Sequence, residues 1–370
     1  MNIPAILKKE GIEIKSKLKT EQVKQIASII SEKMCETFPE HNLQKQNLFS
    51  SLTNLDMYVA KMPLDSGAKY FSQNHAIYFN GTINFEQLDT LVFHECLHAI
   101  QEIKNENGKL LRLGLYHIPS NKGQGINEAS VQFMASKATH TKNDSVKYYN
   151  MDFHTESPLY YPIETALIKQ LIYFTGSYPL FHSTLYSNDI FKNTLIAKCG
   201  KKFYHTLEYN FDLLIYYEQL LADFSSSLSN CCENSNKQKK LNHKIETVKS
   251  LLLEITLSTQ NLIIENCFQA EFNLVKDQLS LNQFQKKLYD FHELLITTPC
   301  YQFYNSFYCE MMNQLEEKRE FIKTYGDLNY FNNMQKDLLD LQKVQFGFQF
   351  FRKLFDKLKL LLEEAIRQKD

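Results

Sequence analysis

Apolar positions divide the chain into a first part with mixed periodicity and a second part with helical periodicity. Residues 20–37 carry apolar side chains at steps of three and four after Thr20, a suitable N-cap, and predict an amphipathic helix. Between about residues 50 and 80, apolar and polar residues alternate between proline and glycine residues. This pattern is typical of two or three strands of a small sheet.

Residues 84–103, NFEQLDTLVFHECLHAIQEI, predict the next helix. Asn84 can act as its N-cap, with Gln87 three residues later in an approximate capping box. Five apolar residues recur at steps of four and three and form a stripe that we expect to face the core: Leu88, Val92, Cys96, Ala99 and Ile103. Cys96 is then a small buried apolar group, and the opposite face of the helix is free for other chemistry.

Further elements follow this helix. Residues 109–118 are expected to form a strand or an extended loop, and the turn-forming cluster at 120–125 precedes another helix. Residues 158–176 predict one more helix, with a proline at its start and a glycine at its end. We expect a turn region around 176–200 that divides the protein.

Beyond residue 200 only Pro299, Gly326 and Gly347 interrupt the helical periodicity, which continues through residues 344–362. This predicts an antiparallel helical bundle. The expected fold class is α+β, predominantly α. A mixed domain over residues 1–190 would be followed by a helical domain over residues 191–370.

Composition narrows the class of protein. The chain has 370 residues with 41 Lys+Arg and 42 Asp+Glu, so nothing indicates a nucleic-acid partner. No apolar run reaches about 18 residues, and the first residues lack a signal-peptide pattern, so we expect no transmembrane segment. Eight cysteines without a CxxC pair indicate free thiols in a reducing compartment. The expected location is the cytoplasm, or outside the cell by a route without a signal peptide. Nothing in the sequence indicates the oligomeric state.

The sequence HECLH within the predicted helix has the HExxH pattern. His94 and His98 are four residues apart, which places both imidazoles on one helix face, one turn apart. There they can share a tetrahedral zinc ion while Glu95 lies beside the metal's open position. The alternative is a chance match in a helix that binds no metal.

A catalytic zinc site needs a third protein ligand. Glu128 is the candidate, because it begins a helix on which Glu128, Gln132 and Ala135 share one face. The alternative is an ordinary first-turn glutamate stabilised by the helix dipole. Asn127 and Ser130 are expected only to cap the helix locally.

HECLH followed by INEAS resembles the gluzincin metallopeptidases, and the resemblance covers roughly residues 50–180. It implies a zincin-like catalytic domain with His94, His98 and Glu128 as zinc ligands and Glu95 as general base. Two features depart from the pattern, so no subfamily is identified. As many as 29 residues separate His98 from Glu128, and Gln132 stands where thermolysin-like members carry an aspartate that holds a zinc histidine.

In the implied mechanism, zinc polarises the scissile carbonyl and acidifies a bound water, while Glu95 transfers the proton to the leaving amine. The oxyanion needs a donor, for which five residues are candidates: Tyr116, His117, His154, Tyr160 and Tyr161. Gln132 and Glu164 are candidates for contacts with the ligands. For Glu164, the alternative is a partner of its own helix dipole.

The sequence therefore predicts a zinc-dependent peptidase with a peptide or protein substrate. Two alternatives remain open. The first is a catalytically inactive zincin-fold protein that uses its helical domain to bind a partner. The second is a structural protein without zinc, in which HECLH is accidental.

Overall fold

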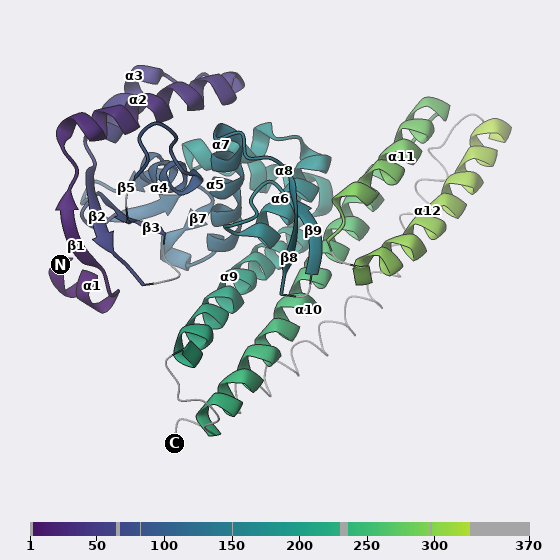
Figure 1. Cartoon of the computed structure of the whole chain (residues 1–370). Helices are drawn as coiled ribbons and strands as arrows, with labels where there is room; N and C mark the ends of the chain where they lie inside the picture. The colour runs from purple at the N-terminus through teal and green to yellow at the C-terminus, as the bar shows by residue number, and fades with distance from the viewer. Residues whose placement is uncertain are drawn as a thin grey trace. The chain divides into compact units, whose positions relative to one another are not determined.

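The computed structural model describes most of the chain: residues 3–63, 67–81, 83–149, 151–229, 236–296 and 298–325. These residues are mostly helical and carry small β-sheets (Figure 1), which confirms the α+β, predominantly α class. The chain forms two compact units. The first comprises Met1–Ala270 and Leu288–Phe307, and the second comprises Glu271–Lys287 and Tyr308–Asp370.

The predicted boundary at residue 190 does not separate these units. The expected turn region instead folds as two helices, α7 (Tyr178–Tyr186) and α8 (Ile190–Cys199). Helix α8 packs against α9 (Lys201–Ser229), and α9 packs against α5 (Gln124–Ala138). Because these helices bury their apolar faces on one another, the first unit continues well past residue 190.

The largest sheet has the strand order β1-β2-β4-β3. Its strands are β1 (Glu13–Lys17), β2 (Asp56–Lys61), β3 (Ala68–Phe71) and β4 (Ala76–Asn80). Strands β2 and β4 are parallel, whereas β1 and β3 run antiparallel to their neighbours. The predicted alternation identified β2 and β4. It missed β1, whose five residues are all exposed and therefore show no buried face.

Helices flank this sheet. The predicted first amphipathic helix is α2 (Thr20–Thr37), with Lys19 rather than Thr20 at the N-cap position. It packs against α3 (Lys45–Thr53), and the short α1 (Ile3–Lys9) belongs to an apolar cluster on the sheet. That cluster contains Leu7, Ile12, Ala60, Met62, Phe71, Ala76 and Tyr78.

The helix with the HExxH pattern is α4 (Thr90–Ile100), which begins later than predicted. Its N-cap is Asp89, whose side chain accepts a hydrogen bond from the main-chain nitrogen of Leu91 at 2.8 Å. Asn84 instead caps a separate turn. All residues from Val92 to Ala99 are buried, so this helix has no free face. Ile103 lies beyond the helix end, 39% exposed.

Two smaller sheets and one helix complete the surroundings of α4 and α5. Strands β5 (Glu102–Lys104), β6 (Leu110–Leu113) and β7 (Tyr116–His117) form one sheet, which agrees with the extended segment expected there. Strands β8 (Asp144–Tyr148) and β9 (Met151–Thr155) form an unpredicted hairpin. Helix α6 (Pro162–Thr175) confirms the predicted helix and ends at Gly176. Short 3₁₀ turns cover Pro39–His41, Ile118–Ser120 and Phe291–Leu294.

The later described residues are helical, as the periodicity predicts. They form α10 (Asn236–Phe272), α11 (Gln278–Asp290) and α12 (Thr298–Tyr325). The helix expected over 344–362 lies outside the described residues, and the antiparallel bundle stays a prediction. In the second unit, the buried ammonium of Lys318 donates to the carbonyl oxygen of Phe272 at 2.8 Å.

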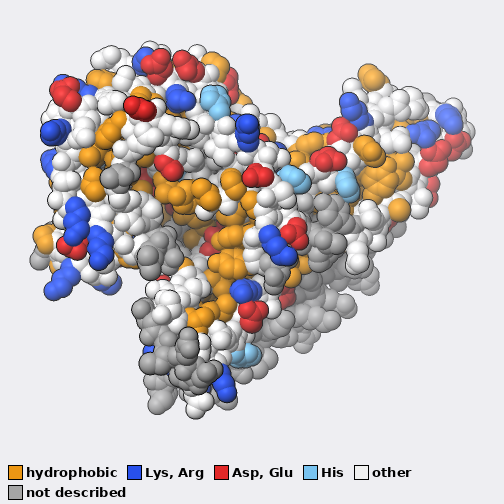
Figure 2. All heavy atoms as spheres, viewed as in Figure 1, with side chains coloured by type: hydrophobic (Ala, Val, Ile, Leu, Met, Phe, Trp, Pro, Cys, Tyr) orange, Lys and Arg blue, Asp and Glu red, His pale blue; other side chains and the backbone are white. Residues whose placement is uncertain are grey.

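The surface of the protein carries no dominant charge in the view shown. Figure 2 shows acidic and basic side chains interspersed over the visible face, in keeping with 41 Lys+Arg and 42 Asp+Glu in the sequence. Over the described ranges, none of the helices combines the length and apolarity needed to cross a membrane.

Candidate metal centre

Helices α4 and α5 lie side by side in the first unit (Figure 1) and bring three predicted ligands together. The Nε2 atoms of His94 and His98 are 2.9 Å apart. The Oε2 atom of Glu128 lies 3.0 Å from Nε2 of His94 and 3.3 Å from Nε2 of His98. All three ligand atoms therefore converge on one point between the two helices.

This geometry fits a metal ion with tetrahedral coordination. Zinc bonds of 2.0–2.1 Å to nitrogen and oxygen imply ligand atoms about 3.3 Å apart, close to the observed separations. Among the described residues, His94, His98 and Glu128 are the group of histidine, cysteine and acidic side chains arranged to hold a metal. Cys96 is fully buried and does not belong to that group, as its position on the core stripe predicts.

The three side chains also perturb one another electrostatically. Burial disfavours the charged form of His98, but the adjacent Glu128 carboxylate outweighs it and raises the pKa of His98 to about 9. Burial acts in the opposite direction on Glu128, and there the two imidazoles hold the pKa of the carboxyl group well below its usual range. The surroundings of Glu128 therefore favour its ionised carboxylate form, facing positive charge.

Both histidines contact a glutamine on the side away from the ligand point. Nδ1 of His94 lies 2.9 Å from Oε1 of Gln132, the contact that the sequence suggested. Nδ1 of His98 lies 3.2 Å from Oε1 of Gln101, which the sequence analysis missed. Gln101 follows His98 by three residues, so helical spacing could have identified it as a neighbour.

Asn127 does more than cap its helix locally, contrary to the expectation from sequence. Its Oδ1 atom accepts hydrogen bonds from Nε2 of Gln101 at 3.3 Å and from the main-chain nitrogen of Leu115 at 3.0 Å. Asn127, the residue directly before Glu128, therefore joins Gln101, the partner of His98, to the main chain at Leu115. Ser130 instead bonds to the hydroxyl of Thr184 on α7.

Glu95 lies beside the ligand group without belonging to it. Its side chain is 7% exposed, and its Oε2 atom accepts a hydrogen bond from the main-chain nitrogen of Tyr70 at 2.6 Å. Tyr70 belongs to β3, the edge strand that packs against α4. A carboxylate is thus held between the metal centre and the sheet.

Tyr161 is the oxyanion candidate that lies against the metal centre. Its ring stacks on that of His94, with centroids 5.7 Å apart and 16° between the planes. It is the N-cap residue of α6, in a left-handed conformation with φ of 49°. Burial, and then the nearby Glu128 and Glu95, raise the pKa of Tyr161 well above its usual value, so its hydroxyl keeps its proton.

The other four candidates lie elsewhere or have other partners. Tyr116 donates to Oδ1 of Asn121 at 2.5 Å, and His117 contacts the hydroxyl of Ser120 at 2.7 Å. His154 is exposed on β9. Tyr160 lines a cavity at the start of α4.

Glu164 is fully buried, and no hydrogen bond or ion pair joins it to His94, His98 or Glu128 in the described part of the chain. Neither of its carboxyl oxygens has a hydrogen-bond partner among those residues. Burial, and then the neighbouring Glu218 of α9, raise the pKa of Glu164 well above its usual value. Its position in the first turn of α6 is the one expected for a partner of the helix dipole.

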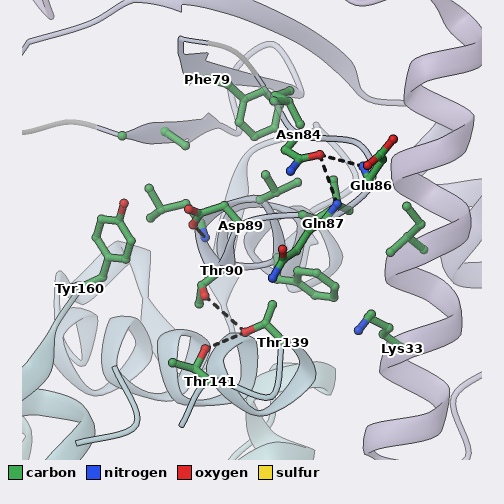
Figure 3. Close-up of a pocket in the computed structure, with 18 of the residues that line it drawn as sticks. Lys33, Phe79, Asn84, Glu86, Gln87, Asp89, Thr90, Thr139, Thr141 and Tyr160 are labelled. Carbon is green, nitrogen blue, oxygen red and sulfur yellow. Dashed lines mark hydrogen bonds between the residues drawn. The ribbon is translucent and has the colours of Figure 1, made fainter. Parts of the chain in front are cut away.

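A cavity of about 710 Å³ lies at the start of α4 (Figure 3). It lies between the N-terminal half of α4, strands β3 and β4, helix α2 and the turn after α5. The hydroxyl of Thr139 lies 3.3 Å from that of Thr90 and 2.9 Å from that of Thr141, along one wall. The lining continues along α4 to Phe93 and does not include His94, His98 or Glu128.

We find no matching family model, no similar curated protein and no similar solved structure, so the chemistry of the site has to be argued from its geometry.

Proposed function

We propose that the protein is a zinc-dependent peptidase with a zincin-like catalytic core. The observation that carries the proposal is the convergence of His94, His98 and Glu128 within 4.8 Å of one another on two buried helices. A purely structural zinc site would usually be closed by four protein ligands, whereas three leave one position open for a reacting molecule. The adjacent Glu95 can act as the general base for a water molecule at that open position.

In the proposed hydrolysis, different residues of the chain have different roles. When bound, zinc supplies a Lewis acid that polarises a carbonyl group and acidifies water. Glu95, held by the main-chain nitrogen of Tyr70, takes the proton of the attacking water and returns it to the leaving amine. Tyr161 donates its hydroxyl proton to the developing oxyanion from its place against His94. The cavity beside α4 receives a side chain of the substrate.

The first test is the zinc content of the purified protein, measured beside Glu128→Ala and His98→Ala. We expect about one zinc per chain in the parent and a clear loss in both variants. His154→Ala is the matched control, because this histidine is exposed on β9 and is not part of the ligand group. If the parent binds no zinc after reconstitution, the proposal that it is a zinc-dependent peptidase is rejected.

A peptide-library digest then separates the enzyme from its closest alternative. Cleavage that requires zinc supports the peptidase. Stoichiometric zinc without cleavage of any peptide favours an inactive zincin-fold protein that binds partners through its helical domain.

A further inference from the structure

The outer nitrogen of each ligand histidine faces a neutral carboxamide instead of a carboxylate. Gln132 is fully buried and Gln101 is 1% exposed, so water does not compete for either contact. Such partners normally fix the tautomer of a ligand imidazole and set its basicity. Which atom of each amide faces the histidine therefore decides whether the imidazole can bind a metal.

For His94, a main-chain carbonyl fixes the polarity of the contacts. The hydroxyl of Ser157 donates to the carbonyl oxygen of Tyr160, which can only accept. Ser157 must therefore accept from Nε2 of Gln132, at 2.9 Å. The oxygen of Gln132 then faces Nδ1 of His94, so this nitrogen carries the proton and Nε2 keeps its lone pair for the metal.

For His98, a main-chain N–H group fixes the polarity of the contacts. The nitrogen of Leu115 can only donate, and it fixes Oδ1 of Asn127 as an acceptor. Nε2 of Gln101 donates to that same oxygen, which leaves Oε1 of Gln101 facing Nδ1 of His98. When both histidines are neutral, their Nε2 lone pairs thus point at one place beside the Glu128 carboxylate, an arrangement that favours a cation there.

The contacts of Gln101 depend on a glycine. A Cβ atom added at Gly114 would lie 2.2 Å from Oδ1 of Asn127 and 2.4 Å from Nε2 of Gln101. Gly114 also has φ of 53°, a conformation that other residues rarely adopt. The main chain therefore closes tightly over the Gln101–Asn127 pair and holds both amides in place.

We propose that Gln101 and Gln132 are positioning residues that present both Nε2 atoms to the metal through neutral partners, so that the metal is correctly placed but remains exchangeable. A carboxylate partner would add negative charge and make each imidazole a stronger ligand, whereas an amide orients it without that gain. This inference rests on the proposed zinc site and concerns how firmly the site holds its metal.

The test compares zinc affinity, measured by competition with a chelator, in the parent, Gln101→Leu, Gln132→Leu and Gln132→Glu. We expect each leucine variant to bind zinc about 10- to 100-fold more weakly. Gln132→Glu should bind it more tightly, because the hydroxyl of Ser157 can rotate to donate to the new carboxylate. Cobalt(II) absorption spectra should change in the leucine variants, since a misoriented imidazole alters the ligand field.

Gln170→Leu is the matched control. Gln170 is also fully buried and hydrogen-bonded, to Gln260 and to the carbonyl oxygen of Leu294, but it does not contact the metal ligands. Its replacement should destabilise the metal-free protein as the other leucine variants do, yet leave zinc affinity and the cobalt spectrum unchanged.

Parent-like affinity and spectra in both leucine variants would overturn the inference, as would weaker zinc binding by folded Gln132→Glu. A parent that binds no zinc would instead remove the metal centre itself, and with it any role for the two glutamines. These failures are distinguishable, because the first leaves a zinc protein and the second does not.

Discussion

The Oε2 atom of Glu95 lies 2.6 Å from the main-chain nitrogen of Tyr70, across the gap between α4 and the edge strand β3. The nitrogen is available because strand residues alternate in the direction of their main-chain groups. Gly67 accepts from Asn80 of the neighbouring strand, so Tyr70, three residues further along, points the other way. The hydrogen bond holds the proposed base at a fixed position beside the metal ligands.

Glu95→Gln should retain zinc and lose hydrolysis of any peptide that the parent cleaves. The amide oxygen of glutamine can still accept from Tyr70, so the fold is preserved, but an amide cannot take a proton from water. Zinc content and turnover on the same sample give the answer. Glu106→Gln is the control, because Glu106 is exposed and belongs neither to the ligand group nor to the cavity lining. Full turnover in Glu95→Gln would remove this residue from the mechanism.

Tyr161→Phe should lower kcat by about 10²- to 10³-fold with little change in KM, because the lost hydroxyl would act on the transition state alone. The phenyl ring can keep the stacking on His94, so zinc content should not change. Steady-state kinetics of this variant are compared with those of Tyr160→Phe, the neighbouring tyrosine that lines the cavity at the start of α4. A larger loss of kcat in Tyr160→Phe than in Tyr161→Phe would identify Tyr160, and not Tyr161, as the oxyanion donor.

Gly114→Ala should destabilise the protein by roughly 1–3 kcal/mol and also weaken zinc binding, since its Cβ would push Asn127 and Gln101 apart. Thermal unfolding with and without zinc measures both effects. Gly108→Ala is a matched control, because Gly108 also has positive φ, at 73°, but its added Cβ would meet nothing within 4 Å. It should lose stability through backbone strain only, with unchanged zinc affinity. Equal zinc affinity in both variants would contradict the prediction.

His41 should make the protein less stable in acid. The residue is 4% exposed, and neither ring nitrogen has a hydrogen-bond partner among the described residues. Burial lowers the pKa of His41, although Glu40 opposes this effect and His182 adds to it. The folded state therefore binds the proton less readily than the unfolded chain, so stability is complete above the unfolded pKa of about 6.5 and declines as the pH falls below it.

The difference in unfolding temperature between the parent and His41→Phe, followed from pH 7.5 to pH 5 in a chelator, isolates this contribution. The parent should lose stability relative to the variant over that range. A difference that stays constant with pH would show that His41 does not titrate on unfolding.

Much of the candidate site could be predicted from local sequence. The spacing of His94 and His98 requires only one turn of helix, and Glu128 and Gln132 need only one face of a second helix. Helical and alternating periodicities likewise predicted α2, α6, β2 and β4. The pattern is clearest in α2, where buried apolar residues alternate with exposed polar ones at helical spacing.

Other features depended on tertiary contacts. Helix α4 is buried all round, so the sequence stripe could not locate its start at Asp89 or separate Ile103 from it. Helices α7 and α8 replaced an expected turn region because they pack on neighbours from distant parts of the chain.

The sequence by itself determined the fold class and the residues that can bind a metal, because helical spacing and side-chain chemistry are local properties. Only the tertiary structure decided that Glu95 meets Tyr70, that Tyr161 covers His94 and that Gln101 reaches Asn127. Each of these contacts joins elements far apart in sequence or fixes a side chain whose direction depends on its surroundings. Periodicity carries no information about such contacts, since they depend on how the helices and the sheet pack together.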